Sequence, residues 1–75
     1  MNRQSTLAHL GMRQSATIRG IGGHPSLRAR LQELGFTPGA KVRLVARAAF
    51  GGALACQVRG STIALRRADA TCVEL

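Results

Sequence analysis

Aromatic and acidic residues are scarce in this chain of 75 residues. It contains no Trp, no Tyr and two Phe, and three acidic residues stand against eleven Lys and Arg. The shortage of aromatic rings removes the stacking surfaces that single-stranded nucleic-acid binders use. The formal net charge of +8 still predicts attraction to an anionic partner. Charge alone does not distinguish nucleic acid, a membrane surface and an acidic protein.

Long apolar runs and nucleotide-binding motifs are also missing. No stretch reaches the roughly 18 consecutive apolar residues of a membrane-spanning helix, and the scattered arginines near the amino terminus do not fit a signal peptide. The glycines lack the spacing of a dinucleotide-binding or Walker-type phosphate loop. We therefore expect a cytoplasmic protein that has no nucleotide site and binds no cofactor of that kind.

One short amphipathic helix is predicted before the middle of the chain. Leu27, Leu31 and Leu34 recur at i, i+4 and i+7, which places them on one face of a helical repeat. A helix of about two to three turns is unstable in isolation. We therefore expect the three leucines to dock it on the core.

Both ends of this helix carry recognisable signals. Pro25 suits the first turn, where no backbone donor is needed, and Ser26 is expected to help cap the free amides. Gly35 is placed for a left-handed residue after the last turn, and Pro38 prevents continuation. Phe36 has two interpretations: it packs back onto the helix end, or it presents an apolar anchor to a partner.

The rest of the chain consists of short alternating segments separated by glycine-rich corners. A loop is predicted at residues 50–52, a helical turn over residues 66–70, and strands over residues 15–21, 41–47, 54–58, 62–65 and 72–75. These elements predict a mainly β fold, a small antiparallel barrel of about five strands with one short α-helix between the first and second strands. Residues 1–6 are expected to be a flexible segment ahead of a single domain over residues 7–75.

Two segments of the sequence resemble the FeoA family, the small cytosolic component of bacterial ferrous iron uptake. They are RLQELGFTPGAKVRLV at residues 30–45 and GSTIALRRADATCVEL at residues 60–75. The resemblance covers roughly residues 7–75 and implies an SH3-like barrel that does no chemistry itself. It also implies a partner, the cytosolic region of FeoB, which is a membrane permease with a GTP-binding domain.

This resemblance gives the expected function. The protein would be an accessory protein of ferrous iron uptake that binds FeoB and modulates transport. We expect it in the cytoplasm, recruited to the inner face of the membrane by its partner, with no membrane insertion and no nucleic acid of its own. Whether it activates or restrains the permease stays open.

Exposed residues beside the helix and on the basic strand are the candidates for binding this partner. They are Arg28, Gln32, Phe36, Thr37, Arg43 and Arg47. Arg43 and Arg47 are expected to share a strand face. One interpretation is a basic patch that also includes Lys41, Arg59, Arg66 and Arg67. A solvated charged face explains the same residues without a partner.

Two other functions stay open from the residues alone. The charge fits a small nucleic-acid-binding barrel, although the lack of aromatic rings counts against it. A transition-metal-binding or sensing role would rest on His9, His24, Cys56 and Cys72, none of which has paired ligand spacing. His24 and Cys56 are the weak metal candidates, and both cysteines are expected to be reduced and buried.

Overall fold

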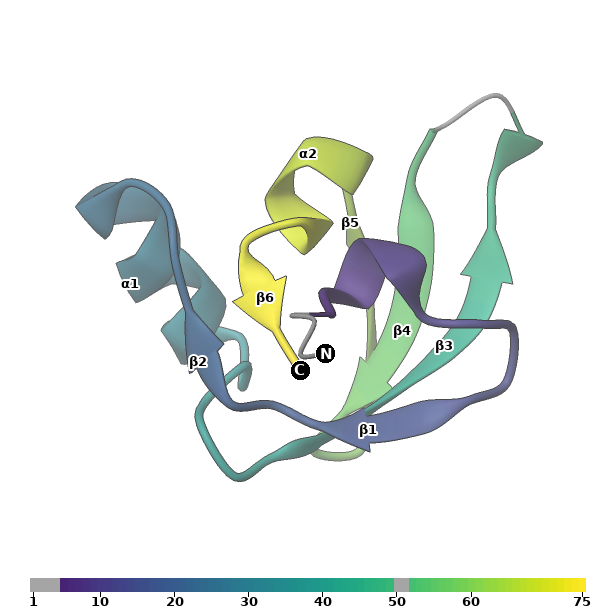
Figure 1. The fold of residues 1–75 in the computed structure, drawn as a ribbon, viewed down its shortest axis with the longest axis horizontal. Helices are drawn as coiled ribbons and strands as arrows, with labels where there is room; N and C mark the ends of the chain where they lie inside the picture. The colour runs from purple at the N-terminus through teal and green to yellow at the C-terminus, as the bar shows by residue number, and fades with distance from the viewer. Residues whose placement is uncertain (1–4, 50–51) are drawn as a thin grey trace.

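The strands form two antiparallel sheets around one core (Figure 1). The computed structural model describes residues 5–49 and 52–75. The larger sheet has the order β1-β3-β4-β5, with strands Ser15–Thr17, Lys41–Arg47, Leu54–Val58 and Ser61–Leu65. The smaller sheet pairs β2, Gly20–Ile21, with β6, Val73–Glu74. The helices are the 3-10 helix η1, Leu7–His9, and the α-helices α1, Pro25–Glu33, and α2, Arg67–Ala70.

The mainly β architecture is confirmed, but the predicted first strand is divided between the two sheets. Its first part, β1, pairs with β3, and its last two residues, β2, pair with β6. Ile18 lies between them and is buried at 1% exposure. Its amide donates to Ala40 and its carbonyl accepts from Gly39, both at 2.8 Å. The chain changes partner strands at this buried residue, so the sheets form an open arrangement instead of a closed barrel.

The first and last described residues pair with each other. The Leu75 amide donates to the Ser5 carbonyl at 2.8 Å, and Thr6 forms a bridge with Glu74. Residues 1–4 of the segment expected to be flexible lie outside the described residues, as do residues 50–51 of the predicted loop. No helix in the described ranges is long and apolar enough to cross a membrane.

Helix α1 ends where its sequence predicts. Gly35 has a φ of +109°. The Phe36 amide donates to the Leu31 carbonyl and the Gly35 amide to the Gln32 carbonyl, both at 3.0 Å, which are the paired bonds of a Schellman cap. The Phe36 ring is fully buried in the same core cluster as Leu31. The capping interpretation of Phe36 is confirmed, and its alternative as an exposed anchor for a partner is wrong.

The leucine face of α1 is only partly confirmed. Leu31 is completely buried and Leu27 packs against the core from its edge, but Leu34 is 41% exposed. Leu34 is the C-cap residue of the helix, and the chain reverses direction immediately after it. Because of that reversal, Phe36 fills the core beneath the helix end and Leu34 stays at the surface.

The amino-terminal cap of α1 also differs from the prediction. His24, not Ser26, is the N-cap residue. The His24 Nδ1 accepts from the Ser26 amide at 3.2 Å and lies 3.0 Å from the Ser26 hydroxyl. Pro25 takes the first helical position, as predicted.

A β-bulge at Val45 interrupts the alternation predicted for β3. Before it, Val42 and Leu44 are buried while Arg43 is exposed. The pairing register with β4 then shifts between Leu44 and Ala46. One extra residue in a strand sends every later side chain to the opposite side of the sheet. The residues after the bulge therefore lie on the side of the sheet opposite to the one that the sequence predicted.

This bulge turns Arg47 onto the inner side of the sheet. Arg47 is paired across the sheet with the buried Leu54. Its guanidinium donates to the carbonyl oxygens of Ala8 at 3.2 Å and Leu10 at 2.6 Å. Arg47 thus ties the end of η1 to β3. The prediction that Arg43 and Arg47 share a strand face is wrong, because the alternation restarts at the bulge.

Leu31 and Leu34 provide a matched test of the core. Leu31→Ala is expected to lower the free energy of unfolding by about 2 to 5 kcal/mol, because it removes a fully buried side chain. Leu34→Ala is expected to change it by less than about 1 kcal/mol, because Leu34 is already 41% exposed and lies outside the core cluster. Urea unfolding followed by circular dichroism measures both changes. Equal losses would contradict the assignment of Leu34 to the surface.

Arg47 tests the consequence of the bulge. Arg47→Lys is expected to lower the free energy of unfolding by about 1 kcal/mol and to speed amide exchange in η1, because an ammonium group does not reproduce a guanidinium fork. Arg43→Lys, on the opposite side of the same strand, is the matched control and should shift stability by less than about 0.5 kcal/mol. The same loss in both variants would show that Arg47 has no special contact.

Candidate functional site

The outward-facing side chains of the larger sheet form a polar and basic surface. Cross-strand pairing aligns Ser15, Arg43, Gln57 and Thr62 in one row across the four strands. Lys41 lies two residues before Arg43, on the same side of β3. All five side chains are exposed. They face away from the buried residues that alternate with them along the strands.

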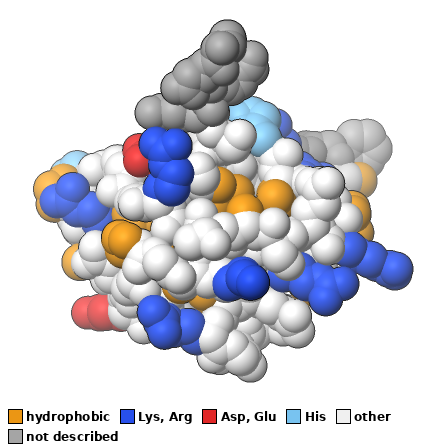
Figure 2. Space-filling view, turned by 60° about the horizontal axis from the view of Figure 1, so that its bottom comes forward, with side chains coloured by type: hydrophobic (Ala, Val, Ile, Leu, Met, Phe, Trp, Pro, Cys, Tyr) orange, Lys and Arg blue, Asp and Glu red, His pale blue; other side chains and the backbone are white. Residues whose placement is uncertain are grey.

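A shallow depression of about 300 Å³ lies on this surface and reaches the turn between β4 and β5. Five of its lining residues carry the polar chemistry and are named here the basic sheet face: Ser15, Lys41, Arg43, Gln57 and Arg59. Figure 2 views the molecule from its lower side and shows basic side chains spread over it, with acidic side chains at its lower left edge and at its upper left, where one lies beside a basic side chain.

Arg59 reaches the basic sheet face from a tight hairpin turn. Arg59 and Gly60 have φ values of +50° and +82°, the left-handed pair expected of a type I′ turn. The aliphatic stem of Arg59 comes within 3.4 Å of the position that a Cβ on Gly35 would occupy. Its Nη2 donates to the Thr37 hydroxyl at 2.8 Å. These contacts join the hairpin to the segment that follows α1 and fix the guanidinium in place.

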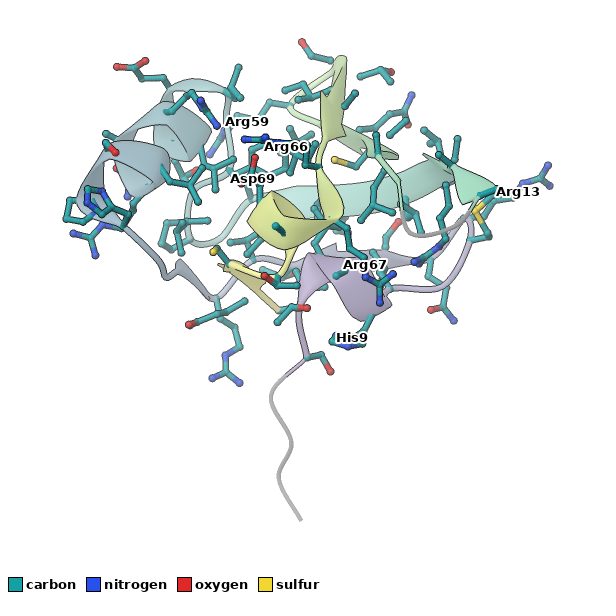
Figure 3. All side chains as sticks on the ribbon, turned by 90° about the horizontal axis from the view of Figure 1, so that it is seen from above. His9, Arg13, Arg59, Arg66, Arg67 and Asp69 are labelled. Atoms are coloured by element: carbon teal, nitrogen blue, oxygen red, sulfur yellow. The ribbon has the colours of Figure 1, made fainter. Side chains whose placement is uncertain are left out.

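The acidic residue Asp69 forms its ion pairs outside this face. Asp69 of α2 is 3.6 Å from Arg30 and 3.7 Å from Arg66 (Figure 3). Arg66 therefore joins this charge cluster, and Arg67 lies on α2, so neither extends the basic sheet face as the sequence suggested. Among the described residues, no carboxylate lines the depression. The positive charge of the basic sheet face is therefore screened by salt but is not neutralised by a carboxylate that lines the depression.

Two of the six predicted partner-binding residues belong to this site. Arg43 lines it, and Thr37 contacts it through the hydrogen bond from Arg59. Arg28 and Gln32 are exposed on α1 but do not line the depression. The other two are used by the fold, as described above.

Ser15 and Gln57 are the site residues that the sequence analysis missed. Both are uncharged, and only their pairing with Arg43 from the two neighbouring strands places them beside a cation. Alternation within a strand shows which side a residue faces, but it does not show which residue stands opposite. No local signal in the sequence would have selected these two.

The metal candidates are engaged by the fold. The Nδ1 of His24 caps α1, and the Nδ1 of His9 lies 2.9 Å from the Thr6 hydroxyl. The Cys56 Sγ is buried and donates to the Ile63 carbonyl at 3.5 Å. Within residues 5–49 and 52–75, no group of three or more His, Cys, Asp or Glu is placed to hold a metal ion.

The cysteines are both free, but they differ in environment. Cys56 is fully buried, as expected, whereas Cys72 is only half-buried. Burial raises the pKa of the Cys56 thiol from 9.0 to about 11. A thiol that stays protonated at neutral pH is a poor nucleophile and a poor metal ligand, so Cys56 serves the core.

Fold and surface together define a small SH3-like domain with an exposed basic sheet. The pattern of the FeoA domain matches residues 5–75, and the chain belongs to the FeoA family, whose members are accessory proteins of ferrous iron transport. A search of curated proteins found no match.

Solved structures of similar proteins agree with this assignment. Stenotrophomonas maltophilia FeoA, crystallised with zinc, is 34% identical with a TM-score of 0.81, and the match covers 92% of this chain and 86% of that one. FeoA from Chlorobium tepidum is 26% identical with a TM-score of 0.85, covering 92% and 66%. A manganese-dependent transcriptional repressor reaches a TM-score of 0.87 at 18% identity, covering 99% and 36%. At that identity the likeness shows the fold alone.

Cys56 makes stability depend on alkaline pH. The thiol ionises near pH 9.0 in the unfolded chain but near pH 11 when folded, so ionisation favours unfolding between these values. The contribution is fully present below the lower value and is expected to fall by about 3 kcal/mol as pH rises through the higher one. Urea unfolding at stepped pH measures the slope. Cys56→Ala should flatten it and Cys72→Ala should retain it; an unchanged slope in Cys56→Ala would contradict this assignment.

Proposed function

We propose that this protein binds the cytosolic region of a FeoB-type membrane permease and thereby modulates ferrous iron transport. Membership of the FeoA family supports the transport role. The single observation that best supports binding is the basic sheet face, where three cations line one exposed depression. Like charges held close together repel one another, and an anionic partner would relieve that repulsion.

The proposed role is one of docking and not of catalysis. The Stenotrophomonas maltophilia relative has been described as a candidate activating factor of bacterial ferrous iron transport. In this proposal the GTP chemistry belongs to the permease, and the small domain acts by occupying a surface on it. The domain would work in the cytoplasm and reach the membrane through its partner.

Nucleic-acid binding is the second candidate, favoured by the same surface and by the net charge of +8. The small number of aromatic rings counts against this candidate. The chain has no Trp and no Tyr, and Phe36 is buried in the core. Proteins that hold single strands usually stack bases on exposed rings, and within residues 5–49 and 52–75 this candidate would have to rely on phosphate contacts.

Direct titration tests the proposal. The purified cytosolic region of the permease is expected to bind the full chain saturably at physiological salt, as measured by isothermal titration calorimetry with and without guanine nucleotide. Salt at this concentration screens charges, and it weakens a specific complex less than it weakens nonspecific attraction between charges. Duplex DNA of matched total charge is the control ligand. Absence of saturable binding, or equal binding to the DNA, would contradict the proposal.

Arg28→Glu then tests whether α1 takes part in the interface. The substitution reverses an exposed charge and should leave the fold intact. Weaker binding of the permease region is expected, and an unchanged dissociation constant would remove this helix from the interface. Arg67→Glu on α2 makes the same change of charge elsewhere and controls for net charge.

A further inference from the structure

We infer that the basic sheet face recognises an extended acidic segment of a protein partner, aligned with β3 and with its carboxylates on Lys41, Arg43 and Arg59. This inference rests on the proposed function, because it names the chemistry of the permease segment held at this site. The observations that carry it are the spacing of the cations, the fixed position of one of them, and the composition of the surface around them.

The spacing of the cations matches an extended chain. Lys41 and Arg43 are separated by one residue and lie on the same side of β3. Same-side residues of a strand are about 7 Å apart, because each residue advances the chain by about 3.4 Å. A second extended chain has the same distance between its alternate residues. Acidic residues at alternate positions therefore meet both cations in register, whereas consecutive acidic residues direct half of their carboxylates away from the sheet.

Arg59 is in position before any partner arrives. Its stem packs over Gly35 and its guanidinium is bonded to Thr37, as described above. A side chain that is already restricted loses less conformational entropy when it binds. The guanidinium has five donors, so the bond to Thr37 leaves others for a carboxylate. Arg59 thus supplies a preorganised third cation beside the two on β3.

Uncharged side chains complete the surface. Ser15 and Gln57 flank Arg43 on the two neighbouring strands. Their hydroxyl and amide groups both donate and accept hydrogen bonds, which suits the backbone of a peptide segment as well as its carboxylates. A ligand consisting of isolated phosphate groups would need donors only.

The surroundings favour a protein segment over a lipid surface. Proteins that lie on membranes combine basic residues with apolar side chains that enter the lipid. The exposed large apolar side chains among the described residues are Met12 and Leu34, and neither lines the depression. The depression has a volume of about 300 Å³, which is enough to receive a few side chains of a peptide.

Two synthetic peptides of identical composition test the inference. Both contain two Glu among Ser residues. In the alternating peptide one Ser separates the two Glu, and in the other peptide the two Glu are adjacent. Fluorescence anisotropy with the full chain, at about 50 mM and about 150 mM salt, measures both affinities. The alternating peptide is expected to bind several-fold more tightly, and its affinity should fall as salt increases.

Charge reversal locates the binding surface. The double variant Lys41→Glu with Arg43→Glu is expected to weaken the alternating peptide by about tenfold or more, since two attractions become repulsions. The double variant Arg28→Glu with Arg67→Glu is the matched control, because it reverses the same number of exposed charges at residues that do not line the depression. Figure 3 places Arg67 on the far side of α2 from Arg59, and the affinity of this control should stay within about twofold. Thermal unfolding of each variant verifies that it is folded.

Thr37→Val separates preorganisation from net charge. It removes the hydroxyl that holds Arg59 and leaves every charge in place. The alternating peptide is expected to bind about two- to fivefold more weakly, the effect of one lost hydrogen bond that orients a cation. An unchanged affinity would remove Arg59 from the inference.

Several outcomes would overturn the inference. Equal affinity for the two peptides, or an equal loss in the double variant Arg28→Glu with Arg67→Glu, would show that net charge alone is recognised. Tighter binding to phosphatidylglycerol vesicles or to a single-stranded oligonucleotide, abolished by the double variant of Lys41 and Arg43, would assign the face to a different ligand.

The permease region separates this inference from the proposed function. If it binds the double variant of Lys41 and Arg43 as tightly as the unchanged protein, only the inference about the sheet face fails. If the alternating peptide binds as expected but the permease region does not, only the proposed function fails.

Discussion

Burial of the Phe36 ring is the constraint on which the rest of the structure depends. A helix of nine residues does not hold its shape alone, and α1 is docked chiefly through Leu31 and the ring that follows its cap. The reversal at Gly35 that buries Phe36 also places Thr37 at the surface beside the hairpin. Thr37 in turn holds Arg59. One apolar contact in the core therefore determines where a surface cation stands.

Local chemistry predicted the elements of the fold well. The end of α1 was visible in Gly35 and Pro38, because a positive φ and a missing amide are properties of single residues. The errors arose where a segment depends on its neighbours in space. Alternation in residues 15–21 does not show that the chain changes partner strands at Ile18. Nor does it show the bulge at Val45, which turns the exposed Arg47 to the other side of the sheet and into contact with the end of η1.

The candidate site was predictable in charge but not in composition. Arg43 was selected correctly as an outward residue of a basic strand. Ser15 and Gln57 became members of the site through the pairing register, which is set by strands far apart in the sequence. Arg66 left the predicted patch because Asp69 lies next to it. Summing the charges of the chain estimates how strongly a surface attracts anions, and the sheet topology decides where it does so.

Arg59 occupies a backbone position that suits other residues better. Asn, Asp and Gly are the residues preferred at the first central position of a type I′ turn, where φ is positive. Another side chain at that position lowers the stability of the fold by about 1 kcal/mol or more. Selection for heat resistance would therefore replace this arginine early, and the resulting protein would be more robust and less cationic. At this turn, a substitution that raises thermal stability also removes a cation from the anion-binding surface. A stabilised variant of the domain would therefore not reproduce the binding properties of the natural protein.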